Sequence, residues 1–389
     1  MIMVSYAYVG ISTGRKTEVT ELRQRFAVIC LRGRVREYGI KVGGMETGEQ
    51  NSIADVRGVS VGHVTLIQGE GKLVPGRGPV RTGVTVILPH EGSLFNEKLR
   101  AGVHVQNGAG ELTGTLQVME WGVLETPIAL TNSLNVGLVH DAVVEYMLQK
   151  EPDIGIEADV VLPVVGECDD SYLNDIRGRH VKREHVLEAA GTASEKVVEG
   201  SVGGGTGMSA MGFKAGIGTA SRKTGKEFGH HTVGVLVNAN FSGELRVNGI
   251  PVGRRLQTKS VIRRESRSII TVIATDAPLT SLQLRRVGAH VPLALGRVGS
   301  TSASSSGDIS IAFSTAERLD RSFAQISGKT EAVNSETIDE LFRATVEATE
   351  EAVLNSVFTS ETMKGRDDHV SPSLPVEEAL EIMKTSGGL

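Results

Sequence analysis

The sequence contains little that would indicate a secreted, membrane-bound or nucleic-acid-binding protein. Among its 389 residues only Cys30 and Cys168 are cysteines, which is too few for a disulfide framework, so we expect a cytoplasmic protein. No apolar run reaches the ~18–20 residues that a membrane-spanning helix needs. The net charge is −5, and the short basic cluster from Lys259 to Arg267 is typical of a solvated loop. We therefore expect neither a nucleic-acid nor a membrane partner.

Aromatic residues are scarce as well, at 4%, whereas glycine is abundant, with 47 residues. The core must therefore consist of Val, Ile, Leu and Ala. The glycines are dispersed through apolar segments, which indicates tight turns and close backbone approaches. Residues 1–45 are mixed in character, and we expect them to form a leader that precedes a single domain over residues 46–389.

Continuous β-branched runs predict strands that are buried on both faces. These runs are Val84–Leu88, Val160–Val165, Thr232–Asn238, Ile269–Ala274 and Ile309–Phe313. Apolar residues at three- and four-residue steps predict helices over Asn135–Leu148, from Asn334 or Ser335 onward, and from about Pro375. The irregular alternation of strands and helices favours α/β or α+β layers over an all-β fold.

The familiar cofactor and metal motifs are absent or incomplete. The glycine-rich stretch 200–222 contains a loose GxGxxG/A, but no convincing strand leads into it. Gly225-Lys226 is followed by Glu227, where a phosphate-binding loop needs Ser or Thr. The ten histidines form no HExxH, and the chain has no CxxC. We expect no cofactor and no metal.

Hydroxyl, carboxylate and amide groups instead gather at the ends of three predicted strands. Ser268 precedes one apolar strand, Ser306 and Asp308 precede another, and Asn240 closes a third. Residues two apart in an extended segment point the same way, so Ser306 and Asp308 are expected to face one pocket. A nucleophilic serine with an acid and an amide oxyanion donor is one interpretation. Local serine turns at strand starts are the alternative.

Six segments of the chain resemble the DmpA/BapA family of aminopeptidases, which act on D- or β-amino-acid N-termini. They are VRTGVTVILP (80–89), NGAGELTGTLQVMEWGVLETPIALTNSLNVGLVHDAV (107–143), GGGTGMSAMGFKAGIGTASR (203–222), VGVLVNAN (233–240), SIITVIATDAPL (268–279) and SGDISIAFSTA (306–316). The resemblance extends from about Asn51 to Pro375. It implies a four-layer αββα sandwich like that of N-terminal-nucleophile hydrolases, but with distinct strand connectivity.

The resemblance also implies self-processing. The precursor would cut itself between Arg267 and Ser268, giving an α segment 1–267 and a β segment 268–389. Ser268 would be the nucleophile, and its freed α-amine, with an ordinary pKa of ~7.7–8.0, is suited to act as base. Alternatively, Ser306 and Asp308 would orient and activate Ser268. Asn240 resembles the asparagine on the oxyanion side.

Further expectations follow from the same resemblance. Asp169 and Asn132 would contact the substrate, which would be a short peptide, an amino-acid amide or an ester. The assembly would be a homo-oligomer, often a tetramer of αβ units. Two residues depart from the family pattern: Arg267 stands where glycine is usual, and Cys168-Asp169 stands where an aromatic residue often follows Glu167.

Two alternatives remain at this point. An uncleaved homologue that binds a small ligand or partner would agree with the departures at Arg267 and Asp169. An acyltransferase of the ornithine acetyltransferase type is related in fold, but its processed nucleophile is threonine, which the serine at position 268 disfavours.

Overall fold

The computed structural model describes residues 32–256, 267–321 and 332–389. The chain divides into a segment Met1–Arg32 and a compact unit Gly33–Leu389. The unit starts ahead of the expected boundary at residue 46, because Val35, Ile40 and Val42 are fully buried in its core. The rest of the expected leader, residues 1–31, lies outside the described residues, as does the stretch 257–266 that contains most of the basic cluster.

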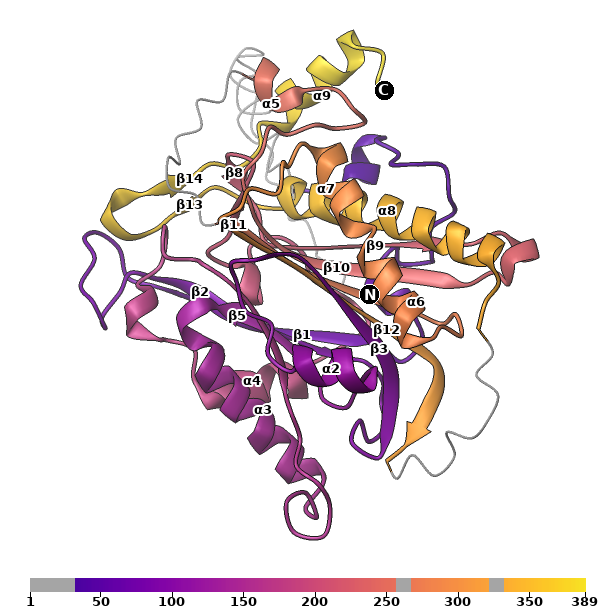
Figure 1. The fold of residues 1–389 in the computed structure, drawn as a ribbon. Coiled ribbons are helices and arrows are strands. Elements are labelled where there is room, and N and C mark those ends of the chain that lie inside the picture. The colour runs from indigo at the N-terminus through magenta and orange to yellow at the C-terminus, as the bar shows by residue number, and fades with distance from the viewer. Residues whose placement is uncertain (1–31, 257–266, 322–331) are drawn as a thin grey trace, which may run out of the picture. The chain divides into compact units, whose positions relative to one another are not determined.

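Two β-sheets form the centre of the unit (Figure 1). The smaller sheet has the order β1-β2-β5-β6, with β1 Ser60–Gln68, β2 Val80–Leu88, β5 Ile128–Asn132 and β6 Val164–Cys168. The larger sheet has the order β4-β3-β12-β11-β10-β9, with β4 Val123–Leu124, β3 Glu97–Gly108, β12 Ser306–Asp320, β11 Arg267–Thr275, β10 Thr232–Asn240 and β9 Ile217–Lys223. The pairs β5–β6 and β11–β12 are parallel, and the other neighbours are antiparallel.

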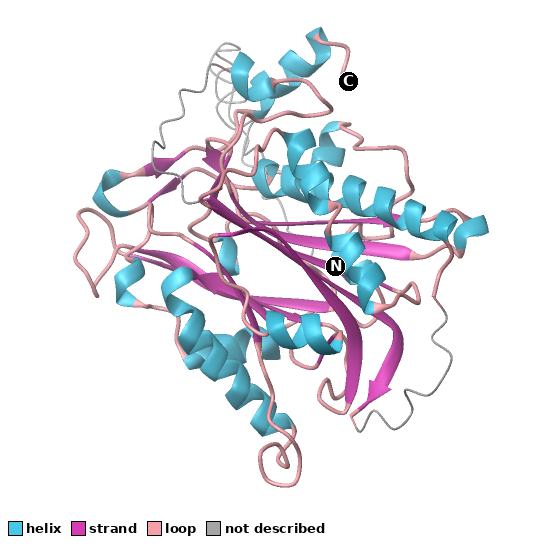
Figure 2. Ribbon diagram, in the orientation of Figure 1, coloured by secondary structure: helices cyan, strands magenta, loops and turns pink. Residues whose placement is uncertain are grey.

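Helices cover the outer face of each sheet (Figure 2). The α-helices are α2 Thr115–Trp121, α3 Val136–Lys150, α4 Arg183–Gly191, α5 Val252–Arg255, α6 Ser281–Gly288, α7 Val291–Val298, α8 Ser335–Phe358 and α9 Val376–Thr385. Helices α3 and α4 pack on the smaller sheet, α8 packs on β9 and β10, and α6 packs on β3 and β12. Two short hairpins, β7 Ser209–Ala210 with β8 Phe213–Lys214 and β13 Met363–Lys364 with β14 Val370–Ser371, complete the unit. The αββα layering expected from the resemblance is confirmed.

The side-chain alternation of the central strands explains the layers. In β11, Ile269 and Ile273 pack into the cluster under α8, whereas Ile270 and Val272 pack between the two sheets. A strand with both faces buried must be apolar on both, which is why these runs are continuous in the sequence. Each fully buried aliphatic side chain contributes about 1.5–3 kcal/mol from burial.

The predicted helices are confirmed, with the expected cap on α8. The Asn334 side chain accepts a hydrogen bond from the Thr337 backbone N–H at 2.9 Å, which satisfies a free donor of the first turn. The strand predicted over Val160–Val165 is displaced. Strand β6 begins at Val164, because Pro163 lacks an N–H for the ladder and Val160 and Leu162 are 68% and 48% exposed.

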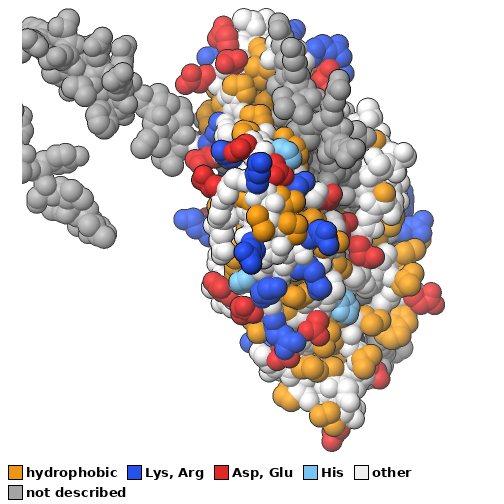
Figure 3. Space-filling view, turned by 90° about the vertical axis from the view of Figure 1, so that its left-hand side faces the viewer, with side chains coloured by type: hydrophobic (Ala, Val, Ile, Leu, Met, Phe, Trp, Pro, Cys, Tyr) orange, Lys and Arg blue, Asp and Glu red, His pale blue; other side chains and the backbone are white. Residues whose placement is uncertain are grey.

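In residues 32–256, 267–321 and 332–389, no helix combines the length and the apolar character needed to cross a membrane. Figure 3 shows one face of the molecule, on which basic and acidic side chains lie close to one another. This mixture agrees with the modest net charge of −5.

Candidate active site

Ser268 lies at the start of β11, in the middle of the larger sheet. It is 5% exposed and pairs with Asn240, the last residue of β10, on one side. On the other side it pairs with Gly307 of β12. Because β11 and β12 are parallel and β10 runs the opposite way, the start of β11, the start of β12 and the end of β10 meet at one edge. The three strand ends proposed from the sequence are therefore brought together.

Ser306 and Asp308, which are two residues apart on β12, form a hydrogen-bonded pair. The Ser306 hydroxyl donates to Asp308 Oδ1 in a short contact. Asp308 Oδ2 accepts a hydrogen bond from Asn107 Nδ2 at 3.2 Å. Both carboxylate oxygens of Asp308 thus have a donor, which fixes the carboxylate beside the Ser306 hydroxyl. Both side chains are buried.

Gly307 separates these two residues and is required by close packing. A Cβ atom at this position would lie 2.7 Å from Gly110 Cα and 3.0 Å from the Ala109 carbonyl oxygen. No side chain fits there, so the backbone of residues 109–110 lies directly against the strand beside Ser268. This contact carries the loop after β3 into the site.

The alternation of β11 and β12 places the polar groups on different faces. Ser268 has the parity of Ile270, which packs between the sheets. Asp308 has the parity of its pairing partner Ile269, which packs under the helices. The Ser306–Asp308 pair therefore lies on the strand next to Ser268, but its side chains project from the opposite face of the sheet.

Asn240 is held in one orientation by two hydrogen bonds. Its Oδ1 accepts from the Ser209 backbone N–H at 3.0 Å, and its Nδ2 donates to the Asp169 carbonyl at 2.9 Å. Asn240 has the same parity as its cross-strand partner Ser268. The side chains of Asn240 and Ser268 therefore project from the same face of the larger sheet.

The two expected substrate-contacting residues lie in different environments. Asp169 follows β6 and is partly exposed, with its Oδ1 accepting from the Ser171 N–H at 2.7 Å. Asn132 ends β5, pairs with Cys168, and is fully enclosed. Its Nδ2 donates to Thr82 Oγ1 at 2.8 Å. Asp169 thus borders the site, whereas Asn132 supports it from within.

Glu167 is a buried carboxylate near the candidate site that the sequence reasoning did not select. It is buried in β6, where Oε1 accepts from the Glu111 N–H at 3.0 Å and Oε2 accepts a short hydrogen bond from Ser133. Its Oε1 lies 3.1 Å from the position of a Cβ atom on Gly110, the residue packed against Gly307. Burial raises the pKa of Glu167, and its two hydrogen bonds oppose that effect. In the sequence, Glu167 could have been recognised as a single glutamate within an otherwise apolar strand.

Cys168 marks where the acidic groups converge. Its thiol is fully buried and lies 3.5 Å from the Asn238 carbonyl of β10. Burial raises the pKa of this thiol well above its usual value, and the nearby charges of Glu167 and Asp308 act in the same direction. Cys168 is therefore an uncharged packing residue between carboxylates.

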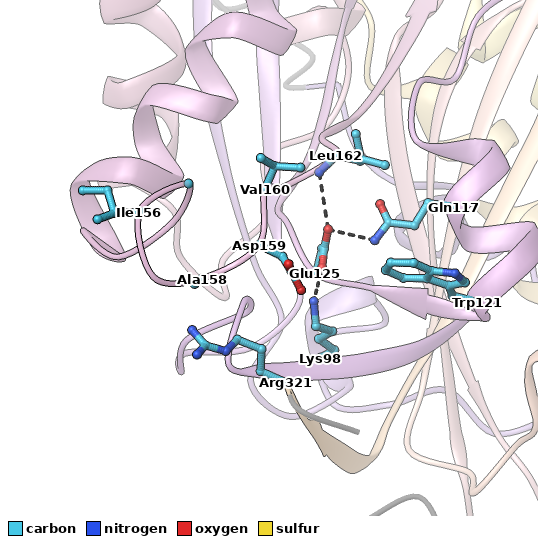
Figure 4. A pocket seen from close by; sticks show the side chains of 11 residues that line it. Lys98, Gln117, Trp121, Glu125, Ile156, Ala158, Asp159, Val160, Leu162 and Arg321 are labelled. Atoms are coloured by element: carbon cyan, nitrogen blue, oxygen red, sulfur yellow. Dashed lines mark hydrogen bonds and ion pairs between the residues drawn. The ribbon is translucent and has the colours of Figure 1, made fainter. Parts of the chain in front are cut away.

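A separate hollow of about 940 Å³ lies between α2, the end of β4 and the loop before β6 (Figure 4). At its floor Glu125 accepts hydrogen bonds from Gln117 at 2.8 Å and from the Leu162 N–H at 3.3 Å, and it forms an ion pair with Lys98. None of its lining residues belongs to the site around Ser268. Within the described part of the chain, no group of His, Cys, Asp and Glu is arranged to hold a metal ion.

Residues 51–371 match the model of peptidase family S58. The chain belongs to this family. It is 41% identical over 369 residues to the β-peptidyl aminopeptidase BapA of Sphingosinicella microcystinivorans, covering 90% of this chain and 92% of that protein.

Several solved structures share its fold. The PH0078 protein from Pyrococcus horikoshii OT3 is 50% identical with a TM-score of 0.87, covering 91% of this chain and 100% of that one. The L-aminopeptidase D-Ala-esterase/amidase from Ochrobactrum anthropi, described as a prototype of the serine aminopeptidases and a variant of the Ntn hydrolase fold, is 37% identical with a TM-score of 0.83, covering 92% and 99%.

This S58 peptidase is a serine hydrolase with aminopeptidase function. The family resemblance noted in the sequence, the expected fold class and the expected reaction type are confirmed. A hydrolase is therefore favoured over the ligand-binding and acyltransferase alternatives.

Proposed function

We propose that this S58 peptidase is a self-processing aminopeptidase that forms an acyl-enzyme on Ser268. The observation that carries the proposal is the buried serine at the start of β11, flanked by Asn240 and by the hydrogen-bonded Ser306–Asp308 pair. An N-terminal nucleophile requires such a position, because the first residue of a strand is rigidly held and still accessible from one end.

Cleavage of the bond between Arg267 and Ser268 would supply the catalytic base. The backbone nitrogen of Ser268 lies level with the Ser306–Gly307 step of β12. Once freed, this amine is placed to accept the hydroxyl proton of Ser268, with the Ser306–Asp308 pair beside it. Arg267 belongs to β11 and is extended, so arginine at this place needs no glycine-like φ.

The oxyanion of the tetrahedral intermediate would bind to Asn240. The amide NH₂ of Asn240 carries two hydrogens, of which one is used by the Asp169 carbonyl. The second would be available to the oxyanion, because Asn240 pairs with Ser268 across the two strands. A preorganised donor of this kind stabilises the charge that develops on the carbonyl oxygen.

The substrate's ammonium group would bind to Glu167, with Asp169 contributing negative charge at the border of the site. A carboxylate that is buried beside the backbone of Gly110 and Gly307 can compensate a desolvated ammonium. Substrates would be short peptides, amides or esters with D-, β- or small L-amino-acid N-termini. We also propose a cytoplasmic homo-oligomer, such as a tetramer, of αβ units.

The test is the denatured mass of the purified protein and of its Ser268→Ala variant. Processing of the 41.3 kDa chain should give two species of roughly 28 and 13 kDa, the smaller beginning Ser-Ile-Ile-Thr. The Ser268→Ala variant should remain a single species and hydrolyse neither a β-alanine nor a D-alanine anilide.

Ser310→Ala is the matched control, because Ser310 is a buried serine of the same sheet that donates to the Gly288 carbonyl. It should process normally. A Ser268→Ala protein that is still cut at residue 267, or that still releases the amino acid, would overturn the proposal.

A further inference from the structure

Lys214 is a fully buried lysine whose ammonium group is surrounded by backbone carbonyls. Its Nζ donates to the carbonyl of Met208 at 2.7 Å, to that of Gly205 at 3.4 Å, and to that of Ala215. Among the ion pairs between described residues, none joins Lys214 to a carboxylate. Burial of a charge without a counter-ion is costly, so this position calls for a specific role.

The Met208 carbonyl is one end of a peptide group whose other end reaches the active site. The N–H of the same peptide belongs to Ser209, and it donates to Asn240 Oδ1 at 3.0 Å. Asn240 Nδ2 in turn donates to the Asp169 carbonyl at 2.9 Å. A continuous chain of hydrogen bonds therefore runs from the ammonium of Lys214, through one peptide group, to the amide of Asn240.

The backbone keeps this chain in register. Strand β8 pairs with β7, so that Lys214 lies opposite Ser209 in the hairpin. The Lys214 N–H donates to the Pro372 carbonyl at 2.6 Å, which ties the hairpin to the segment after β14. The lysine therefore approaches the Met208–Ser209 peptide from its carbonyl side, while Asn240 approaches from its N–H side.

Two physical effects follow from this geometry. The Ser209 N–H sets the orientation of the Asn240 amide. When Oδ1 faces this donor, the NH₂ group must face the other way, toward the Asp169 carbonyl. In addition, hydrogen bonds in a chain polarise one another, and a charged donor on a carbonyl makes the N–H of that peptide a stronger donor. The same polarisation passes through the Asn240 amide to its NH₂ group.

We propose that Lys214 is a positioning residue of this peptidase, which acts through the Met208–Ser209 peptide to orient and strengthen the oxyanion donor Asn240. The inference rests on the proposed role of Asn240. It assigns a catalytic consequence to the glycine-rich stretch 200–222, which the nucleotide-binding motifs left without a function. Burial lowers the pKa of Lys214 to about 7, so its charge and the polarisation of the Met208–Ser209 peptide should decline as the pH rises through that value, while the hydrogen-bonded geometry remains.

The experiment compares ground-state and oxyanion binding in the processed Lys214→Met enzyme. Methionine is similar in length and apolar, so it removes the donor and fills the space. We expect kcat for β-alanine or D-alanine anilide to fall by about 10- to 100-fold with KM nearly unchanged, because only the transition state uses the oxyanion donor. Inhibition by the corresponding amino aldehyde, whose adduct with Ser268 carries an oxyanion, should weaken by a similar factor.

Three further variants separate the possible outcomes. Lys214→Gln keeps one neutral donor and should restore part of kcat. Ser371→Ala removes a neighbouring contact to Ser209, between the two hydroxyl oxygens at 2.8 Å, and should leave kcat unchanged. Asn240→Ala should lower kcat on its own, and Lys214→Met added to it should change kcat by less than about 3-fold.

Each result bears on a different claim. If Asn240→Ala has wild-type kcat, or if the aldehyde does not inhibit the wild type, the proposed function fails. If Asn240→Ala lowers kcat but Lys214→Met raises only KM, the role of Lys214 is refuted. The role is also refuted if the double variant loses kcat by the full product of the two single-variant factors. If Lys214→Met does not fold, the same comparison of kcat and aldehyde inhibition in Lys214→Gln decides the question.

Discussion

At the scale of single residues, the site is distinguished by its negative charge. Besides burial, the charges of Glu167, Asp308 and Asp169 all raise the pKa of the buried thiol of Cys168. A free amino terminus is the part of a peptide that such a site selects, because its ammonium offsets the carboxylates. This charge arrangement agrees with an aminopeptidase rather than an endopeptidase.

The first prediction concerns Glu167. Glu167→Gln should raise KM by about 10-fold or more with a smaller effect on kcat, because it removes the charge that pairs with the ammonium. Burial raises the pKa of Glu167, so protonation removes its charge at a higher pH than usual. The KM of the wild type should therefore rise as the pH falls through that pKa, and the KM of Glu167→Gln should not.

Initial rates over a pH series measure this effect. Glu111→Gln is the control, since Glu111 is an exposed carboxylate on the loop whose backbone N–H contacts Glu167. Equal pH dependence of KM in wild type and Glu167→Gln would rule out Glu167 as the ammonium site.

At the scale of secondary-structure elements, the meeting of β10, β11 and β12 creates the site. The parallel pair β11–β12 places Ser268 level with Gly307, and the antiparallel β10 adds Asn240. The loop after β3 then packs on Gly307 and carries Asn107 to Asp308. The strand pairing and the contact at Gly307 thus fix the relative positions of four segments that are far apart in the sequence.

The second prediction tests the close contact at Gly307. Gly307→Ala should destabilise the fold by roughly 1–3 kcal/mol, because the new methyl group would meet the backbone of residues 109–110. It should also lower kcat, since the displaced strand carries Ser306 and Asp308. Chemical denaturation and initial rates measure the two effects.

Gly296→Ala provides the comparison. Gly296 lies within α7, and a Cβ there meets nothing within 4 Å. Alanine at this position should be neutral or stabilising by up to about 1 kcal/mol. If Gly307→Ala is as stable and as active as Gly296→Ala, the backbone contact does not constrain the site.

At the scale of the whole molecule, the stability should depend in part on the buried carboxyl group of Asp170, which follows β6. Asp170 is fully buried, and Asn174 donates to its Oδ1 at 2.9 Å. Burial raises its pKa to about 7 from an ordinary value of 3.8. The folded state therefore binds a proton that the unfolded state has released, in the range between these two values.

The third prediction follows from this difference in proton binding between the folded and unfolded states. The free energy of unfolding should fall as the pH rises from about 4 to 7, and it should stay lower above 7, with a contribution from Asp170 of up to about 4 kcal/mol. Asp170→Asn is neutral at every pH and should lack this part of the decline. Urea denaturation of both proteins at pH 5 and 8 measures the difference.

Asp141→Asn is the control, because Asp141 is exposed on α3 and pairs only with Arg183 across the surface. Its unfolding free energy should follow the wild type at both pH values. An identical decline in wild type and Asp170→Asn would show that Asp170 is ionised in the folded protein.

Much of the architecture was predictable from local patterns. The runs in β2, β10, β11 and β12 are continuous because both faces are buried, and helix α8 repeats its apolar residues with a helical period. Strands β1 and β3 were not predicted, because their outer ends are exposed and their sequences mix polar with apolar residues. The position predicted for strand β6 was wrong, because Val160 and Leu162 are exposed although their apolar sequence indicated a buried strand.

By itself, the sequence predicted the layered α/β class, the resemblance to a known family implied the αββα sandwich, and the strand ends indicated the residues proposed for the chemistry. Ser268, Asn240, Ser306 and Asp308 were identifiable because each stands at the end of an apolar strand. Only the tertiary structure decided that β11 lies parallel to β12 and next to β10, because strand pairing depends on contacts between distant segments. The parts that we propose for Glu167, Gly307 and Lys214 likewise depend on the tertiary structure, since a carboxylate, a glycine or a lysine acquires a role only from the groups that surround it.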